Sequence, residues 1–283
     1  MRKSDFVLLV LACVPGLLSA QSTTRPAYRD RALIQHANSS VTVTANAPLP
    51  LFQAISAIRE AYGWQVSWEQ AAGYSPFDVV DDTGPRWRAS HPNAKGVTRP
   101  AGGLFTSTWP EVRDLSVTSL KADVLAKLIQ DYNSTDNPGR HTLRTDPDGQ
   151  LAVVGTQVKD ENGAFRQTTP LLDTPLSVEM QKRTVYDTVR TVLAALSAAT
   201  GNRIIIMSVP TNLFRATEVE VGGNRVPARE LLMEALSGTH RPLQYDFGYD
   251  PDAPVYILNV SMALTEQQDA LGQRRPVPID RSR

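Results

Sequence analysis

The sequence predicts an α+β fold with two tandem copies of a small strand-helix-strand-strand-helix-hairpin module after a signal peptide. Two helical segments end at a glycine and lead into a strand, two further helical segments each precede a hairpin, and matching positions in the two halves are separated by similar offsets. With 283 residues, 41% of them hydrophobic and 20% charged, the chain can supply a core for each copy.

The N-terminal segment is typical of a secretory signal peptide. Basic residues follow the initiator methionine, and the apolar stretch Phe6–Leu18 is too short to span a bilayer. Small residues precede Gln21, so we expect cleavage between Ala20 and Gln21. The mature protein is therefore expected to be periplasmic or secreted.

The single cysteine, Cys13, lies inside this segment, in a Val-Leu-Ala-Cys sequence that partly matches a bacterial lipobox. A lipid anchor through Cys13 is the alternative to simple cleavage. If Cys13 leaves with the signal peptide, the mature chain has no thiol, which excludes disulfides, thiolate catalysis and cysteine-ligated metals. No later run reaches the roughly 18 apolar residues of a membrane span, so we expect no transmembrane span in the mature chain.

The first helix of each copy is predicted by apolar residues at helical spacing. Residues 51–62 end at Gly63 and residues 185–200 end at Gly201, and the two glycines are 138 positions apart. A glycine after the last periodic residue is a typical helix stop. Each helix leads into an apolar strand, which we place at residues 64–68 and 203–209.

The second half of each copy is predicted to be a short strand, a helix and a hairpin. The helices contain Val124–Ile129 and Leu231–Leu236 at an offset of 107, and the hairpin turns both read Asp-Pro-Asp, from Asp146 and from Asp250, at an offset of 104. The short strands before the helices are expected at Asp114–Thr118 and Glu218–Val221.

The change of offset from 138 to 104 indicates that the first copy carries about 34 residues that the second lacks. Such an extra segment is normally a surface excursion. The expected boundaries are a signal peptide at 1–20, a first module at 40–158 with an insertion at about 82–114, a linker at 159–172, a second module at 173–263 and a disordered tail at 264–283.

Both copies share a characteristic order of patterns. The second copy reads VLAALSAATGNRIII, EVEV, ARELLMEALSGT, LQYDF and VYIL, and the first reads AISAIREAYGWQVSW, LSV, ADVLAKLIQDY, HTL and LAVV. Each resembles the short N-terminal (STN) domain that bacterial secretins and TonB-dependent transducers share. The resemblance implies a small α+β interaction module outside the cytoplasm and carries over no catalytic residue. Because neither a secretin pore region nor an outer-membrane barrel follows, we do not expect channel formation or transport.

Charge and motif content exclude several functions. Lys and Arg number 29, as do Asp and Glu, so the zero net charge gives no sign of a nucleic-acid partner. The four histidines are scattered without ligand spacing, and no phosphate-binding or nucleophile motif occurs. We therefore expect no metal and no cofactor.

The insertion is the segment with an unusual composition. Between Gly84 and Pro110 it has two tryptophans, four cations and no carboxylate. Cations beside indoles suit an anionic polymer, through charge pairing and stacking, while the alternative is a loop whose tryptophans only cover the module. The candidate binding residues are Arg86, Trp87, Arg88 and Trp109.

These observations predict an exported bacterial cell-envelope protein that is a non-catalytic protein-interaction or envelope-binding module, accessory to secretion or TonB-type transport. Its expected partner is an envelope protein or an anionic envelope polymer, bound for example through an exposed strand edge. The alternative is a cell-wall-active enzyme with its site in the insertion or between the modules. That enzyme needs two carboxylates near a groove, such as Asp81, Asp82 or Glu111.

Overall fold

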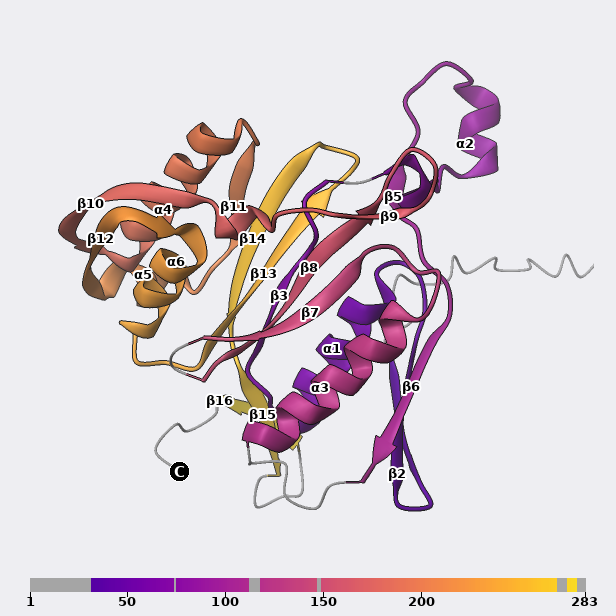
Figure 1. The fold of residues 1–283 in the computed structure, drawn as a ribbon, viewed down its shortest axis with the longest axis horizontal. Coiled ribbons are helices and arrows are strands. Elements are labelled where there is room, and N and C mark those ends of the chain that lie inside the picture. The colour runs from indigo at the N-terminus through magenta and orange to yellow at the C-terminus, as the bar shows by residue number, and fades with distance from the viewer. Residues whose placement is uncertain (1–31, 74, 112–117, 147–148, 269–273, 279–283) are drawn as a thin grey trace, which may run out of the picture. The chain divides into compact units, whose positions relative to one another are not determined.

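Strands from both halves of the chain join in one mixed β-sheet (Figure 1). The computed structural model describes residues 32–73, 75–111, 118–146, 149–268 and 274–278. In spatial order the strands are β11 (Ile204–Ser208), β14 (Val255–Met262), β13 (Leu243–Asp250), β3 (Val66–Glu69), β8 (Leu151–Lys159) and β7 (Arg140–Thr145), and β9 (Phe165–Gln167) pairs with β8. Helices and mixed sheets together confirm the predicted α+β class.

The first half combines two long helices with a second, smaller sheet. The helix α1 (Pro50–Tyr62) ends at Gly63, whose φ of 64° is left-handed, as the sequence predicts. The other long helix is α3 (Thr118–Asn133), and the smaller sheet has three strands in the order β1 (Leu33–Ala37), β2 (Ser40–Ala45) and β6 (Phe105–Pro110).

The second half has a similar order of elements. Its first helix, α4 (Val185–Thr200), also ends at a left-handed glycine, Gly201, and the predicted strand follows as β11. A short helix, α5 (Thr211–Ala216), comes next. The remaining elements are β10 (Pro175–Thr184), β12 (Glu218–Pro227) and α6 (Ala228–Ser237).

Strand pairings correspond between the halves. The antiparallel pair β2–β6 matches β10–β12, the parallel pair β3–β8 matches β11–β14, and the hairpin β7–β8 matches β13–β14. The strand order β3-β8-β7 in the first half is therefore the order β11-β14-β13 in the second.

Each half has its own apolar core. The eight predicted core positions of the second helices are all buried: Val124, Leu125, Leu128, Ile129, Leu231, Leu232, Ala235 and Leu236. One core gathers residues between 41 and 153, and the other gathers residues between 171 and 260. Trp64, which precedes β3, and Trp68 on β3 both lie in the first core.

The two halves meet where β13 runs parallel to β3, a contact that we call the central joint. Asp246 is opposite Trp68, and Phe247 is opposite Glu69. Opposed residues of paired strands point to the same face, and neighbours along a strand point to opposite faces. Because Trp68 belongs to the first core and Phe247 to the second, the two cores lie on opposite faces of the shared sheet.

Among the described residues, the strand that precedes α3 is β6, Phe105–Pro110. The strand expected at Asp114–Thr118 lies outside the described residues except for Thr118, which begins α3. The pattern of β6 alternates, with Phe105, Ser107 and Trp109 buried and the residues between them exposed. The extra segment of the first half is therefore shorter than the predicted 82–114.

Two segments expected to lack structure form strands. In the expected linker at 159–172, β9 folds back on β8, and η2 (Leu171–Asp173) buries Leu172 in the second core. In the expected disordered tail, β15 (Leu264–Gln268) pairs with β16 (Arg274–Pro278). Backbone pairing stabilises both segments, and composition does not reveal it. Among the described residues, no helix combines the length and apolar character needed to cross a membrane.

Candidate functional site

A projecting arm, residues 82–97, follows the short strand β4 (Val79–Asp81) and returns as β5 (Thr98–Pro100). Its helix α2 (Pro85–Ser90) buries none of its residues and lies beyond the sheet in Figure 1. The Trp87 side chain is 43% exposed and stacks on the His91 ring, with 4.7 Å between the ring centroids. The arm thus presents an aromatic pair to solvent.

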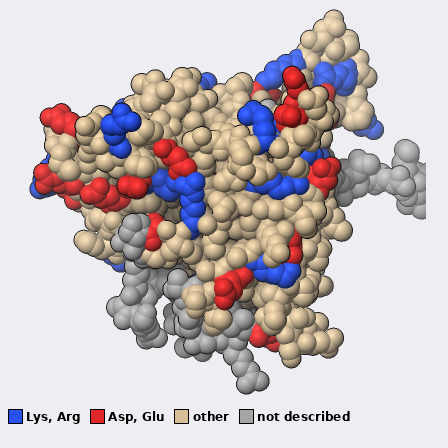
Figure 2. All heavy atoms as spheres, in the orientation of Figure 1, with Lys and Arg blue, Asp and Glu red and all other residues tan. Residues whose placement is uncertain are grey.

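Of the four cations between Gly84 and Pro110, three are paired with carboxylates. Arg88 binds Asp81, Arg99 Nε lies 3.2 Å from Asp82 Oδ1, and Lys95 Nζ lies 3.3 Å from an oxygen of Asp252, in the β13–β14 turn. Figure 2 accordingly shows basic and acidic atoms side by side around the arm. The positive character suggested by the segment's own composition is therefore largely neutralised, which weakens the case for an anionic polymer.

Carboxylates expected for the enzyme alternative are held by partners. Hydrogen bonds from Thr83, and then the Arg88 guanidinium, lower the pKa of Asp81. A general acid requires the opposite, a raised pKa. Asp82 pairs with Arg99, and Glu111 lies 3.0 Å from His36 Nδ1.

Trp109 does not belong to the exposed surface. Its side chain is 3% exposed and packs in the first core from β6, whereas Trp87 lies on the arm. The expectation that these two indoles share a binding surface is therefore wrong. The alternation Phe-Thr-Ser-Thr-Trp from residue 105 was the sequence signal for a strand with one buried face. Arg86 and Arg88 lie on α2, and the expected cleavage site, Ala20 and Gln21, lies outside the described residues.

Exposed apolar side chains gather near the arm. Of the nine large apolar side chains that the described residues expose, five lie between residues 77 and 104: Phe77, Val80, Trp87, Val97 and Leu104. Scattered exposed apolar residues are normal, whereas a contiguous apolar patch is typical of an interaction surface. These five side chains share one stretch of the chain.

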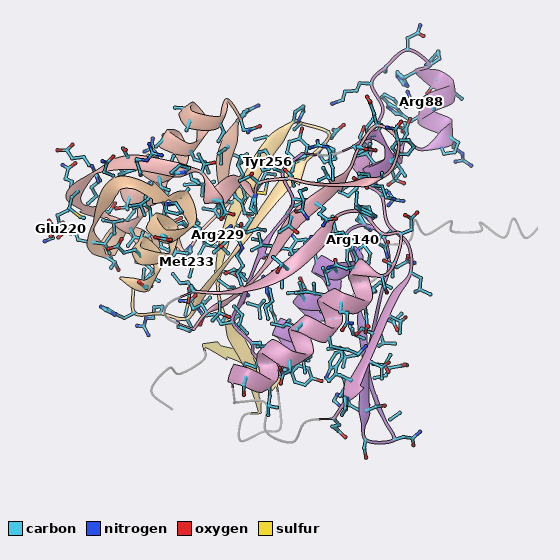
Figure 3. The ribbon with its side chains drawn as sticks, in the orientation of Figure 1. Arg88, Arg140, Glu220, Arg229, Met233 and Tyr256 are labelled. Atoms are coloured by element: carbon cyan, nitrogen blue, oxygen red, sulfur yellow. The ribbon has the colours of Figure 1, made fainter. Side chains whose placement is uncertain are left out.

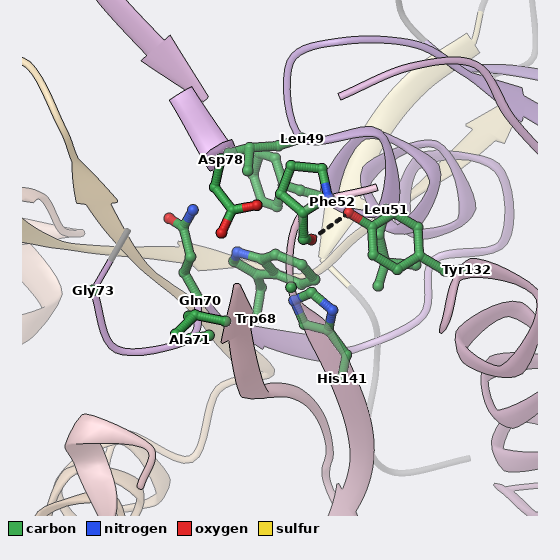
Figure 4. A pocket seen from close by; sticks show the side chains of 13 residues that line it. Leu49, Leu51, Phe52, Trp68, Gln70, Ala71, Gly73, Asp78, Tyr132 and His141 are labelled. Carbon is green, nitrogen blue, oxygen red and sulfur yellow. Dashed lines mark hydrogen bonds between the residues drawn. The ribbon is translucent and has the colours of Figure 1, made fainter. Parts of the chain in front are cut away.

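A small pocket lies in the first half beside η1 (Pro76–Asp78), which contributes Asp78 to its wall (Figure 4). Its empty volume is about 370 Å³ when space open to solvent is included. Apolar and aromatic side chains make up most of the lining. They include Leu49, Leu51, Phe52, Trp68, Tyr132 and Val158.

Two buried polar groups line this pocket without a complete set of partners. Asp78 Oδ1 and His141 Nδ1 have no hydrogen-bond partner, while Asp78 Oδ2 accepts a 3.3 Å hydrogen bond from the Lys159 amide. Burial raises the pKa of Asp78 and lowers that of His141 to about 3, so the imidazole is neutral near pH 7. Trp68 stacks on His141, with 4.7 Å between the centroids. A neutral imidazole and a carboxyl group can orient a small polar group or a water molecule here.

A buried ionic network connects the halves beside the central joint. Arg229 on α6 donates to both carboxylate oxygens of Glu69 on β3, at 2.5 and 2.6 Å, and the Tyr245 hydroxyl donates to Glu69 Oε1 at 2.5 Å. Asp173 also binds Arg229 and receives two hydrogen bonds from Arg144, at 2.6 and 2.8 Å. Figure 3 places Arg229 where α6 meets the shared sheet.

The ion pairs outweigh the effect of burial in this network. Desolvation alone lowers the pKa of Arg229, but hydrogen bonds and charge attraction from Glu69 raise it above its ordinary value. The pKa of Asp173 is lowered by Arg144 and Arg229, against an opposing contribution from burial. Arg229 and Asp173 are therefore held in their charged forms, which is typical of a structural connection between the halves.

Comparison with protein-family models, curated proteins and solved structures finds no match to this chain. The site is therefore interpreted from its geometry alone.

Proposed function

We propose that this chain is an exported bacterial cell-envelope protein and a non-catalytic binding module, accessory to secretion or TonB-type transport. It binds a protein partner through the arm and the apolar side chains at its base. The concentration of exposed apolar side chains between residues 77 and 104 carries the proposal. The resemblance of each half to an STN module supports the envelope location.

A protein partner fits the arm better than an anionic polymer does. The arm exposes an indole beside apolar side chains, and aromatic anchors are enriched at the centres of protein interfaces. Arg88 and Lys95 of the arm, and Arg99 of β5, already bind carboxylates, so polymer binding would require these ion pairs to break.

The cell-wall enzyme has less support than binding. Asp81, Asp82 and Glu111 each contact a basic group, and the lowered pKa of Asp81 keeps it ionised. The pocket supplies one carboxyl group, Asp78, beside a neutral imidazole.

The test replaces residues 84–95 by Asn-Gly. A two-residue turn of this type closes an antiparallel hairpin, and the backbone of Asp82 already bonds that of Val97 at 2.8 Å. The protein and this variant are each immobilised and exposed to the envelope fraction of the source cells and, separately, to purified cell-wall glycan. A third sample carries M180A, a change at an exposed apolar side chain on β10.

A fourth sample carries W87A. We expect envelope proteins that bind the unmodified chain and M180A but bind neither the arm variant nor W87A. Equal retention by all four chains would contradict it. Glycan retention that depends on Arg86 would favour the polymer, and glycan turnover would favour the enzyme.

A further inference from the structure

The two free edges of the shared sheet are the counterparts of the two edges that meet in the central joint. The joint connects β13 to β3, and among the described residues the sheet ends at β11 on one side and at β7 on the other. In the correspondence between halves, β11 is the counterpart of β3, and β7 is the counterpart of β13. The same kind of joint can therefore form between β11 of one copy and β7 of another.

Residue registers identify the equivalent contacts. Gly63 and Gly201 are 138 positions apart, and the same offset makes Met207 the counterpart of Glu69. The offset of 104 makes Leu143 the counterpart of Phe247. In the central joint Phe247 is opposite Glu69. The equivalent pair between copies is thus Leu143 with Met207.

On β7, the backbone beyond the Asn133 contact is available for pairing. The Asn133 side chain donates to the His141 carbonyl at 2.8 Å and accepts from the His141 amide at 3.0 Å, so the His141 backbone points away from β8. Alternate residues of a strand share one direction, so the N–H and C=O groups of Leu143 and Thr145 also point outward. Their counterparts Phe247 and Tyr249 lie on the edge of β13 that faces β3, where Phe247 accepts a 2.9 Å bond from the Gln70 amide.

The outer edge of β11 carries no lysine or proline, although its pairing with β14 is irregular between Ile206 and Ser208. The Tyr256 amide donates to the Arg203 carbonyl at 2.9 Å, so the backbone of Ile204 and Ile206 points away from β14. Exposed edges are commonly blocked by lysine or proline, but β11 reads Ile-Ile-Ile-Met-Ser. Met207 is 64% exposed, whereas its counterpart Glu69 is 1% exposed under the joint.

Side chains at the two free edges are complementary in the same way as those of the joint. In the joint, Glu69 binds Arg229 of α6. The counterpart of Glu69 is Met207, and the offset of 107 makes Ala122 of α3 the counterpart of Arg229. Both members of the ion pair are thus replaced together by apolar residues, so these two positions would not bury an unpaired charge.

We propose that copies of this protein associate head to tail, with β11 of one copy pairing in parallel with β7 of the next and repeating the central joint. Such a contact joins two different surfaces, so it extends into a ring or a filament. Inside the chain the joint is favoured by covalent connection, whereas between copies it depends on concentration. This assembly goes beyond the proposed function, because it uses β11 and β7 and leaves the arm free.

The test measures the weight-average mass of the full chain, expressed for export, by sedimentation over a wide range of concentration. We expect the mass of the unmodified protein at least to double from the most dilute to the most concentrated sample. M207E places a charge against the apolar Ala122 surface and should hold the mass at that of one chain. M180E, which adds the same charge at another exposed methionine, should associate as the unmodified protein does.

A rescue variant tests the direction of the joint. M207E/A122R recreates between copies the pair that Glu69 and Arg229 make within one chain, so it should regain association, now weakened by salt. Thermal melts of all variants check that they fold. A single-chain mass for the unmodified protein at every concentration would overturn the proposal, as would unchanged association of M207E. Failure of M207E/A122R to associate would also overturn it. Regained association would identify the head-to-tail contact, because an antiparallel pair of two β11 edges gains nothing from Ala122→Arg.

Discussion

Replacing Glu69 by Gln should destabilise the whole protein, because it leaves Arg229 buried with less compensation. The two side chains are 2% and 12% exposed and share two hydrogen bonds of 2.5 and 2.6 Å. Removing one partner of a buried ion pair costs about 3–5 kcal/mol. Since Arg229 keeps its contact with Asp173, we expect the lower end, about 3 kcal/mol. For a chain of this size, that lowers the melting temperature by roughly 6–12 °C.

The assay is urea unfolding followed by far-ultraviolet circular dichroism, with the free energy of unfolding extrapolated to water. E218Q is the matched control, since Glu218 pairs with Lys182 on the surface, where the two side chains are 58% and 68% exposed. It should cost no more than about 1 kcal/mol. Replacing both Glu69 and Arg229 by Met should cost less than the sum of the single replacements, because neither charge is left unpaired.

A loss for E69Q no greater than that for E218Q would refute the reasoning and indicate that water reaches the network. Strict additivity in the double replacement would refute the ion pair as the source of the effect.

Three further predictions concern the core, the pocket and the arm. L128D should unfold the first half, since an unpaired buried charge costs several kcal/mol, whereas A126D on the exposed face of the same helix should change the melting temperature little; similar melts for both would contradict the core assignment. Burial lowers the pKa of His141 to about 3, so below about pH 6.5 the unfolded chain binds a proton that the folded chain does not. The free energy of unfolding should therefore fall by up to about 1.4 kcal/mol per pH unit from pH 6.5 toward 3. H141F should remove this part of the slope when urea unfolding is measured over a series of acidic pH values. The Asn-Gly replacement of residues 84–95 should leave the melting temperature nearly unchanged, and iodide should quench Trp87 in the unmodified protein far more than the three buried tryptophans; a large loss of stability would show that the arm packs on the fold.

Local physics explains why much of the fold could be predicted. Apolar residues at helical spacing, followed by Gly63 and Gly201, predict α1 and α4. Glycine readily adopts the left-handed conformation that ends a helix. Alternation of apolar residues predicts the strands after them. The same reasoning places Leu128 and its counterpart Ala235 in the cores.

The candidate site was less accessible to sequence reasoning. Trp87 and Trp109 occur in one segment of similar composition, yet one lies on the arm and the other in the core, because β6 has a partner strand, β2, more than 60 residues earlier in the sequence. The sequence also shows no sign that the cations of this segment are paired. Carboxylates such as Asp252, which binds Lys95, approach them only in the folded chain.

The sequence by itself determined the helices α1, α3, α4 and α6, the glycine stops of α1 and α4, and several strands, since these depend on residues a few positions apart. Only the tertiary structure decided that β13 joins β3, that Glu69 is buried against Arg229, 160 positions along the chain, and that Asp78 and His141 line one pocket. The physical reason is that strand pairing, burial and the pKa of a buried group depend on distant neighbours, and nothing in the local sequence specifies which neighbours those are.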